Sequence, residues 1–273
     1  MQSPPERKSR RTWPPRAGRA PRSAPSLWPA APLCAALLAP ACVPEGPPTT
    51  DTSPPEKSAT ARPKTAPLKA IPLPARPAID EAPFEDTFDR RELGPDYNAL
   101  SPAWKIIGGK LCVRGARNKG LWLLRKLPVN ARIEFDAVAE APDGDLKVEA
   151  WGDGATGATG ASYTNATSYI AILGGWKNTR HVLARLDEHA DDRMELEVDP
   201  TSDDERQRPI APGQPYHFRI ERTNGRSVRM SVNDLLYFEL WDDDPLAGPG
   251  HDHFGFNNWE APACFDNLKI TPQ

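Results

Sequence analysis

Two short stretches of the sequence place a tryptophan beside side chains that pair with hydroxyl or carboxylate groups. GGWKNTRHVLAR occupies residues 174–185, and NNW occupies residues 257–259. The flat face of an indole packs against the C–H groups of a sugar ring, while amide and guanidinium groups bind its polar groups. The candidate carbohydrate-binding residues are Trp176, Asn178, Arg180, His181, Arg185, Asn257, Asn258 and Trp259. We therefore predict one binding surface built from both stretches, the alternative being that each tryptophan only packs at the rim of the fold.

Other polar clusters give weaker indications of chemistry. His251 and His253 stand at alternate positions and suit a metal ion, but no third ligand stands nearby, so a solvated loop is favoured. The three consecutive aspartates that begin at Asp242 are interpreted as a solvated turn. No Ser-His-Asp arrangement is visible, and we assign no catalytic residues.

The elements that must position these residues are predicted to be strands from Phe84 onward. Apolar side chains recur at every second position in residues 133–137, 147–151, 216–220 and 228–232. A period of two indicates strands with one face in a core and the other in water, as antiparallel sheets allow. Strand parity also places His181 on the same face as Arg185.

Turn signals separate these segments. The dipeptides that tolerate the positive φ of tight hairpins are Gly108-Gly109, Asn224-Gly225 and Asn233-Asp234. Residues 183–198 could form a helix, but the faces between its apolar positions are acidic, so we predict a strand, a polar turn and a strand. The Gly/Ala/Thr-rich residues 152–162 are predicted to form a mobile loop. Many short strands with almost no helix indicate a sandwich or barrel.

The first 82 residues differ in composition from the rest. The chain has 32 prolines, which crowd toward the front, and few large apolar side chains accompany them there. Such a segment cannot bury enough apolar surface to offset its chain entropy. A basic stretch followed by SLWPAAPLCAALLAPAC is typical of a secretory signal and is too short to span a bilayer as a helix. We predict a signal in residues 1–41, a disordered Pro-rich linker in 42–82 and one folded domain in 83–273.

The end of the apolar run contains a candidate targeting motif for lipid attachment. Ala39-Pro40-Ala41-Cys42 resembles a bacterial lipobox, although Pro40 departs from the usual pattern. The resemblance implies that Cys42 is lipidated and that the protein lies in the bacterial cell envelope, lipid-anchored at the outer membrane or in the periplasm. The alternative is a disordered tail with incidental cysteines. In the first interpretation the protein meets the membrane through its lipid anchor only.

Net charge bears on the binding partners of the protein, and cysteine usage bears on its compartment. A net charge of -3 argues against nucleic acid, whose binders usually show a basic face on their folded part. Cys34 would leave with the signal and Cys42 would carry lipid. Cys112 and Cys264 then remain as one pair in an oxidising compartment, either as a disulfide or as two buried thiols.

The C-terminal residues resemble a known superfamily. The tail contains YHFRI, a hairpin ending in Asn-Asp, then Asp-Pro-Leu, Phe-Gly-Phe and a closing FDNLKI strand, while FEDTFDR stands at the front. This order is similar to concanavalin A-like jelly-roll domains, nearest the bacterial 3-keto-disaccharide hydrolase-type group, over residues 84–270. The resemblance implies an all-β fold, a jelly-roll sandwich of two antiparallel sheets.

The superfamily's architecture implies further features. Its first and last strands are neighbours, which would bring Cys112 near Cys264. The last strand needs a bulge near Asp266 for its apolar residues to face the core. Sandwiches of this superfamily often hold structural calcium near the terminal strands. The calcium candidates are Asp86, Asp89 and Asp266.

The resemblance also raises glycoside hydrolysis, which needs paired carboxylates. Glu134, Asp136 and Glu140 nearly match the spacing of laminarinase-like enzymes, but the last glutamate comes too late, so we assign no catalysis there. The sequence thus predicts a bacterial envelope lipoprotein whose sandwich domain binds an oligo- or polysaccharide. The alternatives are a glycoside hydrolase of the 3-keto-disaccharide hydrolase type and a protein-binding surface module.

Overall fold

The computed structural model describes residues 76–80 and 82–273, and nearly all its regular elements are strands. One set of strands is β1 (Phe84–Asp86), β3 (Lys105–Ile107), β4 (Lys110–Val113), β6 (Ala131–Ala139), β11 (Pro215–Arg222), β12 (Ser227–Val232), β13 (Leu235–Trp241) and β15 (Ala263–Pro272). The other set is β2 (Tyr97–Ala99), β5 (Leu121–Leu123), β7 (Leu146–Gly152), β8 (Tyr169–Gly174), β9 (Arg180–Arg185), β10 (Met194–Glu197) and β14 (His253–Asn257). Two short helical turns complete the described part, α1 (Gly175–Asn178) and η1 (Glu205–Gln207).

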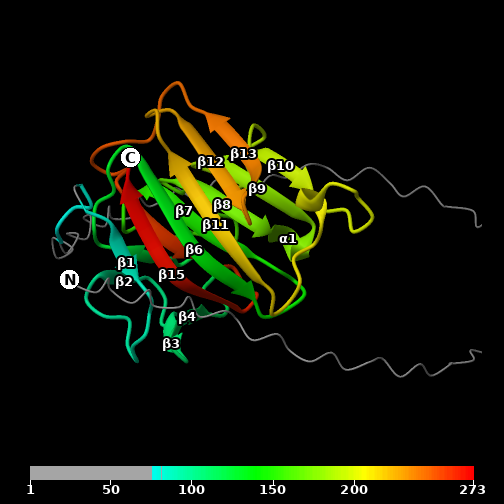
Figure 1. Cartoon of the computed structure of the whole chain (residues 1–273), viewed down its shortest axis with the longest axis horizontal. Coiled ribbons are helices and arrows are strands. Elements are labelled where there is room, and N and C mark those ends of the chain that lie inside the picture. The colour runs from blue at the N-terminus through cyan, green and yellow to red at the C-terminus, as the bar shows by residue number, and fades with distance from the viewer. Residues whose placement is uncertain (1–75, 81) are drawn as a thin grey trace, which may run out of the picture. The chain divides into compact units, whose positions relative to one another are not determined.

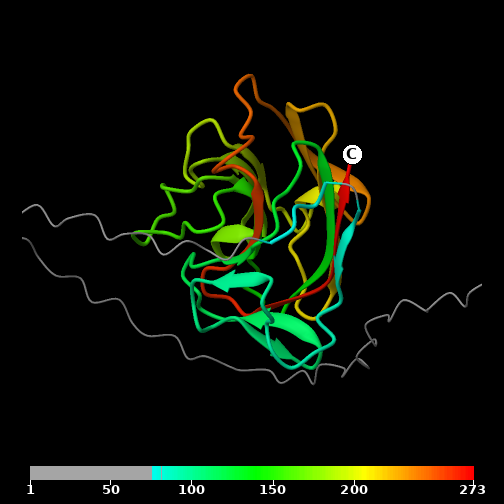
Figure 2. The same ribbon diagram turned by 90° about the vertical axis from the view of Figure 1, so that its left-hand side faces the viewer.

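These strands form two antiparallel sheets that pack face to face (Figures 1 and 2). Sheet A has the order β13-β12-β11-β6-β15-β4-β3, with β1 paired to β15. Sheet B has the order β10-β9-β8-β7-β14-β5-β2. The first and last strands are neighbours, and each sheet combines a run of consecutive strands with strands that are distant in sequence. The predicted fold class, an all-β jelly-roll sandwich of two antiparallel sheets, is confirmed.

The core lies between the two sheets and follows from the period of two. Ile133, Phe135 and Ala137 of β6 are fully buried. Phe135 pairs in register with Phe218 of β11, and their rings stack with centroids 4.9 Å apart. From sheet B, Phe256 meets the ring of Phe135 edge-on at 5.6 Å. Aromatic contact across the layers therefore locks the sheets together.

The turns behave as the sequence predicts. Gly108 and Gly109 connect β3 to β4 with φ of 60° and 75°, and Asn233 and Asp234 connect β12 to β13 with φ of 50° and 65°. Positive φ at both central residues is the requirement of a tight hairpin turn that matches the twist of its strands. Residues 183–198 contain parts of β9 and β10 joined by a polar turn, so the strand interpretation is confirmed there as well.

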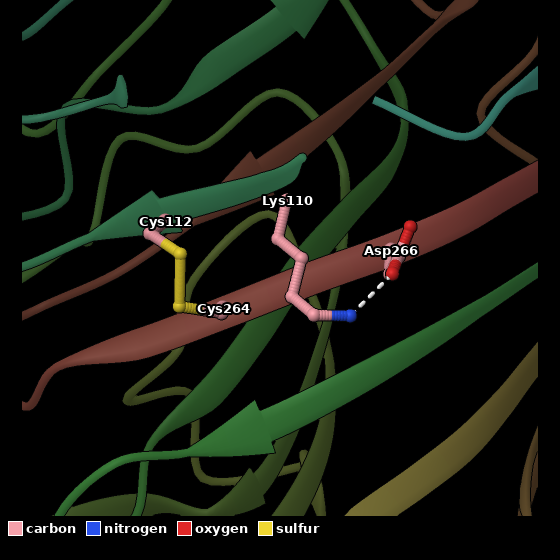
Figure 3. Close-up of a disulfide and its surroundings, with 4 residues drawn as sticks. All are labelled: Lys110, Cys112, Cys264 and Asp266. Atoms are coloured by element: carbon pink, nitrogen blue, oxygen red, sulfur yellow. Dashed lines mark hydrogen bonds and ion pairs between the residues drawn. A yellow bond between two sulfur atoms is a disulfide. The ribbon is translucent and has the colours of Figure 1, made fainter. Parts of the chain in front are cut away.

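Strand β15 pairs with β1 and β4, which come early in the domain, and Figure 3 shows its disulfide with β4. Cys112 of β4 lies opposite Cys264 of β15, and the two form a disulfide, the pair that the sequence predicts. The register of β15 against β6 shifts after Asp266, and Asn267 has a φ of 53°. The predicted bulge is thereby confirmed. Asp266, just before the bulge, pairs with Lys110 of β4, whose Nζ lies 2.6 Å from a carboxylate oxygen.

Contacts with the sandwich begin before Phe84. Ile79 is buried, and its N–H donates to the carbonyl of Lys126 at 2.8 Å. Cys42 and the predicted signal lie outside the described residues, so the lipid anchor stays a prediction. Among the described helices, none is long and apolar enough to cross a membrane.

Candidate functional site

A pocket of about 440 Å³ opens at one end of sheet B, on the side that faces away from sheet A. This volume lies within the range of ~300–1,000 Å³ that is usual for small-molecule sites. Its walls come from the β6–β7 turn, β7 and β8, a loop between β7 and β8, the α1 turn, the segment after β9 and the β14–β15 loop. The lining residues are Asp143, Asp145, Lys147, Ala161, Ser162, Ile172, Gly175, Trp176, Lys177, Glu188, His189, Trp259, Glu260 and Ala261.

The two tryptophans that the sequence singles out both line this pocket. Trp176 comes from the turn between β8 and β9, and Trp259 comes from the loop between β14 and β15. Both are partly exposed, whereas Trp122 and Trp151 are fully buried. Two indoles from segments far apart in the sequence therefore meet at one cavity, as the predicted shared surface requires.

Trp176 is held out of the sheet by an unusual turn. Trp176, Lys177 and Asn178 have φ of 49°, 60° and 61°, a left-handed conformation that costs a side-chain-bearing residue free energy. Asn178 compensates with its side chain. Its Nδ2 donates to the carbonyl of Ile210 at 2.8 Å, and its Oδ1 accepts the Ile210 N–H at 3.0 Å. Asn178 thus holds the turn that carries the indole, and its contact with a ligand stays a prediction.

Trp259 is positioned by its own loop. Its N–H donates to Asp145 Oδ2 at 3.0 Å. The side chain of Asn258, which is buried, accepts from the N–H of Ala116 and donates to the carbonyl of Ala261. The guanidinium of Arg117 lies 5.2 Å from the indole centroid. Asn258 therefore fixes the loop from a buried position, and Trp259 is the residue of this pair that lines the pocket.

The floor of the pocket contains a buried ion pair. Lys147 of β7 lies 2.7 Å from Glu188 and donates to Asn118 Oδ1 at 2.9 Å. Burial disfavours the charge on Lys147, but Asp145 and Glu188 outweigh that effect and raise its pKa. Glu188 also accepts the N–H of Tyr163. Lys147 and Glu188 thus neutralise each other in the pocket floor, and Asp145 adds a second carboxylate near the Lys147 ammonium group.

A second buried carboxyl lies beside this pair but outside the pocket lining. Burial raises the pKa of Glu149 to about 7, against hydrogen bonds from Ser168, Asn257 and Tyr163 that lower it. Ser168 Oγ and Tyr163 Oη donate to Glu149 Oε2 at 2.6 and 2.9 Å. Asn257 donates to the other oxygen, so this predicted sugar-binding residue lies beneath the surface.

His181 and Arg185 lie away from the pocket. They share one face of β9, as predicted, but that face points between the sheets. His181 is fully buried beside Tyr237, its Nδ1 accepts the Gly174 N–H at 2.9 Å, and burial lowers its pKa to about 4. Arg185 pairs with Asp242 at 2.7 Å. The pocket lies on the outer face of sheet B, so His181 and Arg185, on the inner face of β9, do not line it.

Arg180 lies close to the pocket without lining it. Its guanidinium is 5.7 Å from the Trp176 centroid and pairs with Glu195 at 2.9 Å. Arg193 approaches the same ring at 5.0 Å and binds the same glutamate. Both guanidinium groups add cation–π attraction to the indole of Trp176.

The other candidate clusters have local partners. Glu134 and Asp136 stand on the outer face of sheet A, where Arg219 and His217 pair with them at 3.4 and 2.9 Å. Asp242 differs from the expected solvated turn: it is buried because Tyr169 Oη and Arg185 both bind it.

The residues predicted to bind calcium are engaged in other contacts. Asp86 forms a bidentate pair with Arg90 and accepts from Tyr97 Oη at 2.7 Å, while Asp266 binds Lys110. A carboxyl oxygen of Asp89 lies near Gly109. In residues 76–80 and 82–273, no group of three His, Cys, Asp or Glu side chains is arranged to hold a metal ion. Calcium therefore stays a prediction.

Sequence reasoning missed the polar floor. Lys147 and Glu149 alternate with apolar residues, and this pattern predicts exposure, yet both are buried. A signal was present in the neighbouring strands, because YIAIL in residues 169–173 and VLA in 182–184 are apolar at consecutive positions. Such runs indicate strands covered on both faces. The loop that covers the outer face includes residues predicted to be mobile, which instead pack on the sheet.

Among known proteins, similarity is found to solved structures, at low sequence identity. No protein-family model and no curated protein matches the sequence. A putative glycosyl hydrolase from Parabacteroides distasonis is 12% identical, with 65% of this chain and 88% of that chain covered and a TM-score of 0.43. Alginate lyase Aly36B is 9% identical, with coverages of 70% and 97% and a TM-score of 0.43. A Bacillus subtilis protein of unknown function with a galectin-like fold is 13% identical, with coverages of 69% and 94% and a TM-score of 0.43.

Proposed function

We propose that the domain binds carbohydrate in the pocket between Trp176 and Trp259. The observation that carries this proposal is that two partly exposed indoles, from separate loops, line one cavity. Asp143, Asp145 and Lys177 stand around them as hydrogen-bonding groups for hydroxyls. A sugar ring has an apolar C–H face that can pack on the indoles and hydroxyl groups at its edge that can pair with these polar side chains.

Binding is favoured over glycoside hydrolysis by the state of the carboxylates. A hydrolase needs one carboxyl to give a proton and another to act as base or nucleophile across the bond. Glu188 is held in an ion pair with Lys147, and Asp145 accepts the N–H of Trp259. Unchanged oligosaccharides after prolonged incubation with the protein are the expected result, and new products would favour the hydrolase.

The test is a glycan array on the full chain, followed by calorimetric titration of the glycans that bind. Trp176→Ala and Trp259→Ala should each weaken binding at least about fivefold, since aromatic stacking contributes roughly 1 kcal/mol beyond area burial. Trp241→Ala is the matched control, because Trp241 is exposed on β13 of the other sheet. The proposal fails if no glycan binds at millimolar concentration, or if all three variants lose binding alike.

We also propose that the protein is an envelope lipoprotein anchored through Cys42. The support is the basic, apolar and small-residue order that leads to this cysteine. Cys42→Ser should abolish labelling by a radioactive or clickable fatty acid and move the protein out of the membrane fraction. Unchanged labelling and fractionation of the variant would contradict the anchor.

A further inference from the structure

We infer that the pocket receives the end of a saccharide chain, because a loop closes the surface along which a longer chain would run. This inference rests on the proposed carbohydrate-binding function. The loop comprises residues 153–168, between β7 and β8, and is called the covering loop below. It lies over the outer face of sheet B, beside the pocket.

Apolar contact seals the loop to one half of that face. Outward side chains of β8 and β9 are fully or almost fully buried and form one cluster with side chains of the covering loop. The sheet contributes Ile170, Ile172, Val182 and Ala184, and the loop contributes Ala158, Tyr163 and Ala166. This cluster is separate from the core between the sheets, so the sheet is buried on both sides here.

Polar contacts fasten the loop across the remaining width. Tyr163 Oη donates to Glu149 of β7, and its N–H donates to Glu188 after β9. The Trp122 Nε1–H of β5 donates to the carbonyl of Thr156 at 2.9 Å, and Lys119 donates to the carbonyl of Ala158. These polar anchoring points lie at β5 and β7, and together with the apolar contacts to β8 and β9 they extend over most of the sheet.

The region between β5 and β7 is filled by one side chain. Trp122 is fully buried on the outer face. A Cβ placed on Gly255 of β14 would lie 2.7 Å from the indole, and one on Gly152 would lie 2.5 Å from it. Glycine at these positions therefore lets the ring lie flat on the strands, leaving no room there for a saccharide.

The covering loop also forms a wall of the pocket itself. Ala161 and Ser162 line the cavity together with Trp176 and Trp259. A chain that enters between the indoles meets this wall. A volume of about 440 Å³ suits on the order of one or two sugar rings. The terminal unit should therefore provide nearly all of the affinity.

Chain-length dependence tests this inference. The full chain is titrated calorimetrically with cellobiose and cellohexaose, laminaribiose and laminarihexaose, and chitobiose and chitohexaose. In any series that binds, the hexasaccharide should bind within about threefold of the disaccharide. A gain of tenfold or more would overturn the chain-end inference while leaving carbohydrate binding intact. Failure of every series at millimolar concentration would overturn the proposed function and this inference with it.

A second measurement uses chain ends directly and needs no variant. Curdlan, cellulose and chitin are compared before and after partial acid hydrolysis, at equal mass. The amount of protein bound by the active polymer should rise with the number of chain ends. Equal binding before and after hydrolysis would show attachment along the chain and overturn the inference.

A variant that loosens the covering loop provides a third test. Tyr163→Ala removes both the apolar seal and the bond to Glu149, so the folded variant should bind the hexasaccharide at least about fivefold better than the disaccharide. Thr159→Ala, at an exposed position of the same loop, is the control and should behave as the wild type. A folded Tyr163→Ala variant without this gain would contradict the role of the loop. If it does not fold, the hydrolysis experiment still decides.

Discussion

At the scale of single residues, neighbours in sequence have different environments because successive side chains of a strand point to opposite faces of the sheet. Trp176 lies on the turn and faces the pocket, while His181, five residues later, faces the interior between the sheets. Burial lowers the pKa of His181 to about 4, so this imidazole stays neutral and acts as a packed core group. Residue type alone did not distinguish these environments.

Glu149 is the residue whose environment gives a pH signature. Burial raises its pKa to about 7, above the ordinary value of 4.5. A raised pKa means that the folded state retains a proton which the unfolded chain releases. The associated stability is fully present below pH 4.5 and is lost as pH rises through 7.

We expect the melting temperature of the wild type to fall relative to Glu149→Gln between pH 4.5 and 7. The glutamine is isosteric and cannot ionise, so it does not share that loss. Differential scanning calorimetry across this range makes the comparison, with Glu140→Gln at an exposed site as control. A wild-type-minus-Glu149→Gln difference that stays constant with pH would refute the assignment.

At the scale of elements, the α1 turn stores conformational strain to present Trp176. Its three consecutive residues with positive φ would suit glycine better than the side chains they carry. The hydrogen bonds of Asn178 maintain this conformation. Strained backbone beside a cavity indicates a site under functional constraint.

Lys177→Gly should therefore raise the free energy of unfolding by roughly 0.5–1 kcal/mol, because it relieves a left-handed residue with a φ of 60°. Urea denaturation measures the change. Lys105→Gly in β3, at an exposed position, should lower the value by a similar amount, because glycine weakens a strand. A lower stability for Lys177→Gly would show that the turn is not strained.

At the scale of the whole molecule, one covalent bond connects the beginning of the domain to its end. The Cys112–Cys264 disulfide spans 152 residues and joins β4 to β15. Closing so long a loop removes much entropy from the unfolded chain, about 5 kcal/mol in the chain-entropy model. The bond therefore restrains, in the unfolded chain, two segments that lie side by side in the folded sandwich.

Replacing Cys112 and Cys264 together by alanine should lower the free energy of unfolding by roughly 2–5 kcal/mol. Chemical denaturation of the double variant and of the wild type, with and without reductant, makes the measurement. Reductant should move the wild type toward the variant and leave the variant unchanged. Thiol mapping of denatured, non-reduced protein that finds both cysteines free would disprove the bond.

The sequence by itself determined the strands, the hairpin turns and the bulge after Asp266, because each depends on a local pattern or a single backbone preference. It also singled out Trp176 and Trp259 by the polar side chains beside them. Period-two alternation, glycine and asparagine turns and a parity break are all readable within a few residues. Only the tertiary structure decided that Lys147 and Glu149 are buried, that His181 faces inward and that the two indoles share a cavity. Those facts depend on which distant segment covers which face of a sheet, and neither alternation nor spacing along the chain specifies that choice.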